Sequence, residues 1–138
     1  MKADRFGYPT GGVRTLLRLE GAAVFLAATL AYFADGGAWW LYLVLLLAPD
    51  LAFIGYGAGE RLGAMTYNAA HTIVAPVVLV AGAWAVGQDL AFHVGLIWLA
   101  HIGMDRMLGY GLKYPGGSGQ THLGPMGKAK AKARVTIS

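Results

Sequence analysis

The sequence predicts an all-α integral membrane protein, folded as an up-down-up-down four-helix bundle. Hydrophobic residues make up 57% of the 138 residues and charged residues only 13%, with a mean hydropathy of +0.52. Soluble domains carry about 25% charged residues. Four apolar segments each approach the roughly 20 residues that a membrane helix requires. Short connections separate them, and such connections join antiparallel neighbours.

The four spans are expected at residues 12–34, 38–57, 62–86 and 89–110, joined by DGG, AGER and GQ. They form one transmembrane domain, residues 12–110. An N-terminal segment, 1–11, precedes this domain, and a Gly-rich segment with a basic tail, 111–138, follows it. Pro49 and Pro76 lie within the second and third spans. Because proline lacks an amide donor, we expect a local kink at each of them.

The distribution of positive charge orients the bundle. The first and third connections carry Asp35 and Asp89 but no lysine or arginine. Basic residues occur instead before the first span, in the second connection and after the fourth span: Lys2, Arg5, Arg14, Arg61, Lys113 and the tail GKAKAKAR. By the positive-inside rule, this multi-pass chain has both termini in the cytoplasm.

The composition also limits the partners and the chemistry. With no cysteine in the chain, disulfides, thiolate metal sites and cysteine nucleophiles are excluded. The net charge of +4 comes largely from the tail, which is typical of a solvated cytoplasmic end. We expect the lipid bilayer as the main partner, with a homo-oligomer or a larger membrane complex as further alternatives, and no nucleic acid.

Polar side chains from all four spans fall at a similar depth in the cytoplasmic half of the membrane. A rise of about 1.5 Å per residue places Glu20 and Asp50 roughly 10 to 12 Å from the inner ends of their helices, and the polar residues of the other two spans, about five to nine residues in, at a similar depth. The members of this polar layer are Glu20, Asp50, Tyr67, Asn68, His71, His101, Asp105 and Arg106. Each charge inside a membrane costs about 2.5 to 3.5 kcal/mol, so such residues indicate a functional site.

Helical spacing supports convergence within the layer. His101 and Asp105 are four residues apart, as are Tyr67 and His71, so each pair shares one helix face. Asn68 lies three residues from His71 and is also its neighbour. Two helices therefore each present a pair of adjacent polar groups to the bundle.

The first functional hypothesis is a divalent metal site for zinc, iron or manganese. Imidazole and carboxylate groups are suitable ligands for these ions, and the predicted ligands are Asp50, His71, His101 and Asp105. Glu20 would be the general base and Arg106 an oxyanion or phosphate partner. The protein would then be a metal-dependent hydrolase acting on a lipid or another membrane-partitioned substrate.

Two alternatives stay open, so enzyme activity is not established at this point. In the first, the chain is a non-catalytic membrane subunit or interaction protein. Its buried network would be structural, with Arg18 and Arg106 neutralising the acids. In the second, the histidines and carboxylates form a proton or ion path, because histidine titrates near neutrality.

Residues 111–124, GLKYPGGSGQTHLG, are too polar to span the membrane and too rich in glycine to form a stable helix. They follow the inner end of the fourth span. The segment could fold back as a lid, present its amides and Lys113 to an anionic headgroup, or leave the membrane as a flexible tail. It lacks the lysine followed by serine or threonine of a P-loop.

Four stretches carry a resemblance to a known family. They are LLRLEG at 16–21, APDLAFIGYGAG at 48–59, GAMTYNAAHTIVAP at 63–76 and LIWLAHIGMDRMLGYGLKYPGGSGQTHLG at 96–124. Together they resemble the domain of unknown function 4260 family of small bacterial integral membrane proteins. The resemblance implies a four-helix protein of the bacterial inner membrane in which the polar layer is a family feature. It implies no reaction.

Overall fold

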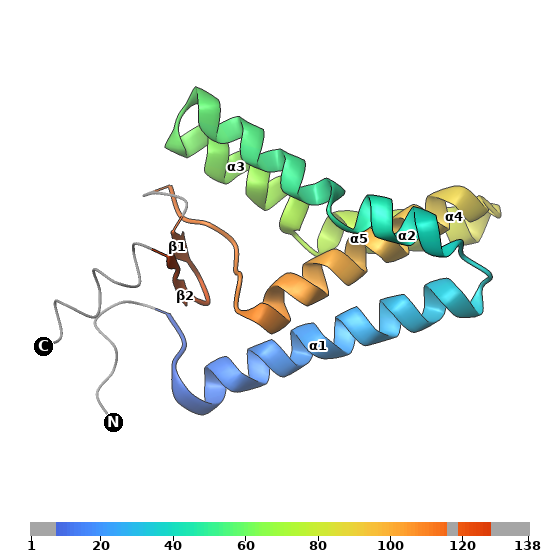
Figure 1. Cartoon of the computed structure of the whole chain (residues 1–138), viewed down its shortest axis with the longest axis horizontal. Coiled ribbons are helices and arrows are strands. Elements are labelled where there is room, and N and C mark those ends of the chain that lie inside the picture. The colour runs from blue at the N-terminus through green and yellow to red at the C-terminus, as the bar shows by residue number, and fades with distance from the viewer. Residues whose placement is uncertain (1–7, 116–118, 128–138) are drawn as a thin grey trace, which may run out of the picture.

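The computed structural model describes residues 8–115 and 119–127 (Figure 1). The predictions for Lys2, Arg5, positions 116–118 of the Gly-rich segment and the basic tail from residue 128 onwards lie outside these ranges. Most of the described chain is helical. Its elements in order are α1 (Gly11–Ala34), α2 (Trp39–Leu46), the 3-10 helix η1 (Ala48–Ala58), α3 (Glu60–His71), α4 (Val74–Val86), α5 (Asp89–Leu108), β1 (Gln120–Thr121) and β2 (Gly124–Pro125).

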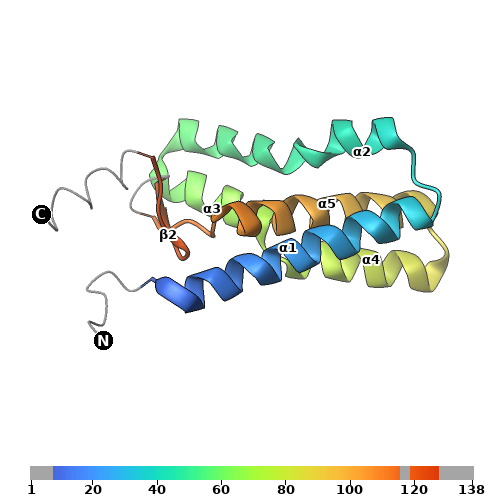
Figure 2. The same cartoon turned by 60° about the horizontal axis from the view of Figure 1, so that its bottom comes forward.

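The long helices α1 and α5 lie side by side, and α4 and α2 also contact α5 (Figures 1 and 2). η1 packs mainly against α3, and this pair diverges from α1 towards the end at which α1 begins (Figure 1). The main hydrophobic core lies between α1, α2 and α5, and it consists of Ala28, Tyr32, Tyr42, Leu96, Ile97 and Ala100. α5 is thus the central helix of the fold.

Glycines allow α1 and α5 to approach closely. A Cβ on Gly103 would lie 2.8 Å from the Gly21 carbonyl oxygen and closer still to the backbone nitrogen of Phe25. A Cβ on Gly21 would in turn collide with the backbone of Arg106 and Met107. Small residues permit such backbone contact between helices. This contact fixes the position of the C-terminal half of α5, which carries His101 and Asp105.

We expect Gly103→Ala to lower the thermal unfolding midpoint in detergent, because backbone atoms of α1 cannot move aside for the new methyl group. The expected loss is about 1 to 3 kcal/mol, as for overpacked cores. Gly82→Ala in α4 is the matched control, since its added Cβ would meet nothing within 4 Å and alanine favours the helix by roughly 0.5 to 1 kcal/mol. Equal midpoints for the two variants would contradict the close contact.

The second predicted helix, residues 38–57, is not one continuous α-helix. α2 ends at Leu46, and the chain continues from Ala48 as η1. Pro49 has no amide hydrogen to donate to the preceding turn. The next amide, of Asp50, donates to the Leu47 carbonyl at 3.1 Å, as a 3-10 turn requires. The Leu46 carbonyl therefore lacks its usual intrahelical donor and is available to another group.

The third predicted helix, residues 62–86, is also interrupted. α3 ends at His71, Thr72 is extended with φ −79° and ψ 139°, and α4 begins at Val74. Pro76 lies in the first turn of α4, where the missing amide hydrogen costs little. Instead of the expected kinks, the prolines accompany two complete breaks. The first break precedes Asp50 by three residues, and the second directly follows His71.

Within the described residues, three segments are long and apolar enough to cross a membrane: Gly11–Ala34, Trp39–Ala58 and Glu60–Val86. At most 17% of the most apolar window of each is buried in the protein, so most of their apolar surface faces outward. The fourth predicted span, 89–110, corresponds to α5, which is not among the three. α5 is instead enclosed, with eight buried residues that include His101 and Asp105.

The described part of the segment after α5 folds back onto the helices. β1 and β2 form a short antiparallel hairpin, and Leu123 in its turn is buried. The Asn68 side chain holds the backbone of Lys113 at both ends, accepting from its amide at 2.7 Å and donating to its carbonyl at 2.8 Å. This pairing ties residues 111–115 to α3.

Candidate metal site

Four side chains converge where η1, α3 and α5 meet. They are Asp50, His71, His101 and Asp105, and one ligand atom from each lies within 4.8 Å of all the others. His71 and His101 are buried, with 1% and 0% of their surface exposed. The Asp105 side chain is 11% exposed and that of Asp50 is 42% exposed. The cluster is therefore enclosed on the side of the histidines and open on the side of Asp50.

The distances within the cluster are nearly uniform. The Nε2 atoms of His71 and His101 are 3.0 Å apart. Each of these nitrogens lies 3.4 Å from Oδ1 of Asp50 and 3.4 Å from Oδ2 of Asp105. Each carboxylate is thus equally distant from the two imidazole nitrogens.

Backbone carbonyls fix which nitrogen of each imidazole carries the proton. Nδ1 of His71 lies 2.8 Å from the Tyr67 carbonyl, and Nδ1 of His101 lies 2.5 Å from the Leu46 carbonyl. Because a carbonyl only accepts, each Nδ1 must be the donor. In the neutral rings, each Nε2 then carries a lone pair. Two lone pairs and two carboxylates face one another, an arrangement that a shared cation stabilises.

The five distances that involve an imidazole nitrogen come close to the edges of a tetrahedral site. At metal–ligand distances of about 2.0 to 2.1 Å, the edge of a regular tetrahedron is about 3.3 to 3.4 Å. The four nitrogen–oxygen distances of 3.4 Å match that edge, and the nitrogen–nitrogen distance of 3.0 Å compresses one edge. The carbonyls behind both rings are the outer partners that metal-binding histidines usually have. This group of side chains could hold a metal ion.

Tyr67 supports the cluster directly, whereas Asn68 supports it from a distance. The Tyr67 ring stacks on the His71 ring, with centroids 3.7 Å apart and an angle of 11° between the planes. Its hydroxyl donates to Oδ2 of Asp105 at 3.4 Å. Asn68 binds the backbone of Lys113 rather than a member of the cluster. Tyr67 therefore orients one histidine and one carboxylate, and Asn68 anchors the chain that follows α5.

The two arginines do not neutralise the acids in the way that the structural hypothesis expects. Arg106 donates to the His71 carbonyl at 3.1 Å and to the Tyr110 carbonyl at 3.3 Å. Arg18 donates to the Met107 carbonyl at 2.7 Å. Within residues 8–115 and 119–127, neither arginine forms an ion pair with a carboxylate. Arg106 instead bridges α5 to the broken end of α3.

Lys113 is a component of the site that the sequence analysis missed. It is buried, with its ammonium 4.6 Å from the centre of the Tyr67 ring and 5.0 Å from that of Phe53. Burial lowers the pKa of this ammonium, and the negative charges of Asp105 and Asp50 oppose the shift. In the sequence, Lys113 follows the last span, where it indicates orientation and could contact an anionic headgroup. Nothing in the pattern places it beneath the cluster.

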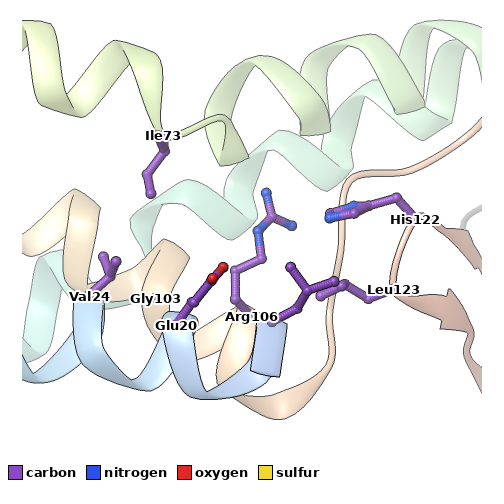
Figure 3. A pocket seen from close by; sticks show the side chains of 9 residues that line it. Glu20, Val24, Ile73, Gly103, Arg106, His122 and Leu123 are labelled. Atoms are coloured by element: carbon purple, nitrogen blue, oxygen red, sulfur yellow. The ribbon is translucent and has the colours of Figure 1, made fainter. Parts of the chain in front are cut away.

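Glu20, the predicted general base, is exposed and lies outside the four-residue group. It lines a separate cavity of about 210 Å³ together with Arg106 and His122 (Figure 3). His122 comes from the segment after α5, and its Nδ1 accepts the Leu112 amide at 2.8 Å. Burial and the charge of Arg106 lower the pKa of His122. Because Nδ1 accepts a hydrogen bond, the ring is in its neutral form.

A comparison with protein families identifies the chain. The family model described as a domain of unknown function, DUF4260, matches residues 14–126. The chain belongs to the DUF4260 family. The matched residues include all four members of the cluster and the hairpin that follows α5, so this DUF4260 domain contains the whole candidate site. No curated protein and no solved structure matches the chain.

Proposed function

We propose that this DUF4260 protein is an integral protein of the bacterial inner membrane with four spans in up-down-up-down order. α5 would be the fourth span, surrounded by the three segments that are long and apolar enough to cross a bilayer. The outward apolar faces of those segments would contact lipid. The distribution of lysine and arginine supports a cytoplasmic location for both termini.

We further propose that the cluster of Asp50, His71, His101 and Asp105 binds one divalent metal ion, with zinc as the best fit. The observation that carries this proposal is the set of four equal nitrogen–oxygen distances of 3.4 Å around two imidazoles. Both imidazoles are held with Nε2 towards the carboxylates. Zinc accepts nitrogen and oxygen ligands and prefers this geometry.

The function that suits such a site in a membrane is hydrolysis of a lipid or another membrane-partitioned substrate. A divalent ion would supply Lewis-acid activation of the scissile group. The exposed ligand, Asp50, would leave the substrate an open side. Water would add across an ester bond to give an acid and an alcohol. The acid would lose its proton to solvent on that open side, and Arg106, which binds the carbonyl of His71, would stabilise a developing negative charge.

The metal proposal is tested by loading the purified protein with Co²⁺ in lipid nanodiscs. We expect one ion per chain and a visible absorption band of tetrahedral type, both displaced by Zn²⁺. Elemental analysis of protein purified without added metal is the parallel measurement. A protein that holds substoichiometric metal in both experiments would contradict the proposal.

A structural metal site in a non-catalytic membrane subunit is the second candidate. One observation favours it: four protein ligands complete the tetrahedron, as in structural zinc sites, whereas catalytic sites usually have three. The two functions differ in the role of Asp50. In a catalytic site, Asp50→Ala keeps the metal and changes turnover of an ester lipid, whereas in a structural site it mainly lowers the unfolding midpoint.

A further inference from the structure

An apolar cavity of about 220 Å³ lies between η1, α2, α3 and α5. It is lined by Leu45, Ala48, Pro49, Ala70, Val94 and Trp98. The only side-chain donor in this lining is the indole of Trp98, and it already donates to the Ala70 carbonyl at 2.6 Å. The lining thus offers hydrocarbon surface and no unused side-chain donor. A polar ligand would lose its hydrogen bonds to water here without replacing them.

The cavity adjoins the candidate metal site along the chain. Pro49 precedes Asp50, and Ala70 precedes His71. Leu45 precedes Leu46, whose carbonyl holds the ring of His101. Three of the lining residues are therefore direct chain neighbours of groups that build the cluster.

α5 shows how the cavity and the cluster are aligned. Val94, Trp98, His101 and Asp105 follow one another at intervals of four, three and four residues, so they lie along one face of the helix. With about 1.5 Å of rise per residue, Val94 lies roughly 10 Å from His101 along the axis. The proposed orientation puts Val94 on the side of the membrane centre. In that orientation, the cavity lies on the membrane-centre side of the cluster.

We propose that this cavity binds the hydrocarbon chain of a membrane lipid whose polar group lies at the metal. The inference rests on the proposed function and names its substrate class, an acyl lipid of the cytoplasmic leaflet. In that leaflet, a lipid has its headgroup towards the cytoplasm and its chain towards the membrane centre. Along α5, the cluster takes the place of the headgroup and the cavity takes the place of the chain, in the same order from the cytoplasm to the membrane centre.

The test is photolabelling with phosphatidylcholine that carries a diazirine near the middle of one acyl chain, followed by mass spectrometry. Val94→Phe fills the cavity at the end remote from the ligands. Val77→Phe is the matched control, because Val77 lines another apolar cavity, with Val80, Ala81, Trp84, Phe92 and Leu99, that adjoins no member of the cluster. Metal content is measured on each preparation.

In the wild type, we expect labels concentrated on the peptides that contain residues 45–49, 70 and 94–98. Val94→Phe should reduce this labelling about tenfold and Val77→Phe should leave it unchanged, with metal content equal in all three. Two results with metal-loaded protein would overturn the proposed acyl-chain site and leave the metal site intact. One is equal labelling of the wild type and Val94→Phe, and the other is labelling spread evenly over the outward helix faces. A wild type that binds no metal would instead overturn the proposed function, whatever the labelling pattern.

Discussion

A His101→Ala protein is expected to be purified without metal, while a His93→Ala protein keeps the wild-type stoichiometry. Both histidines lie on α5, but only His101 belongs to the four-residue cluster. His93 pairs instead with Asp35 at 2.9 Å, near the start of α5. Removal of an outer partner weakens metal binding by roughly 10- to 100-fold. Loss of a ligand that contributes one of four positions should exceed that range.

The His101→Ala and His93→Ala proteins can also be compared by their thermal unfolding midpoints. An ion present at 100 times its dissociation constant stabilises the folded state by about 2.7 kcal/mol. A chelator should therefore lower the unfolding midpoint of the wild type and of His93→Ala, and leave that of His101→Ala unchanged. If His101→Ala does not fold, Asp105→Asn, which preserves the side-chain shape, replaces it in both measurements. Equal metal content in the ligand variant and the control would contradict the metal site.

The parts of the site that follow from helix geometry could be predicted from the sequence. The spacing of four residues placed His101 beside Asp105 and Tyr67 beside His71, and the structure has both pairs in contact. Depth alone did not suffice for Glu20. A residue at the right depth can still point away, because the rotation of α1 about its axis is set by packing. Here Gly21, the residue next to Glu20, packs so closely on α5 that a Cβ would collide with Arg106 and Met107.

Other parts of the site depend on contacts that no side-chain pattern encodes. The acceptors for the two imidazoles are the backbone carbonyls of Leu46 and Tyr67, which any residue type could provide. Pro49 indicated where a carbonyl would be freed, but not which group would use it. The burial of Lys113 depends on the return of the chain after α5 and on its pairing with Asn68. Such long-range contacts cannot be inferred from local spacing.

The break at Pro49 links the fold to the metal site. Pro49 cannot donate to the Leu45 carbonyl, and the Asp50 amide turns to Leu47, so the Leu46 carbonyl is left for His101. An alanine at position 49 restores one helical donor. The α-helix could then continue through Asp50, whose amide would compete with His101 for the Leu46 carbonyl. Asp50 would rotate out of the cluster at the same time, because a continuous α-helix places each residue on a different face from a 3-10 helix.

We therefore expect Pro49→Ala to weaken metal affinity by about 10- to 100-fold, the range for loss of an outer partner. Its metal-free form should be as stable as that of the wild type or more so, because strained functional sites commonly reduce stability. Competition titration with a fluorescent zinc chelator measures the affinity, and thermal unfolding with excess chelator measures the stability. Pro76→Ala is the comparison variant, since both imidazole acceptors, Leu46 and Tyr67, precede its break. If Pro76→Ala lost as much metal affinity as Pro49→Ala, the prediction would be wrong. The helix breaks would then affect metal affinity through general packing and not through the carbonyl that orients His101.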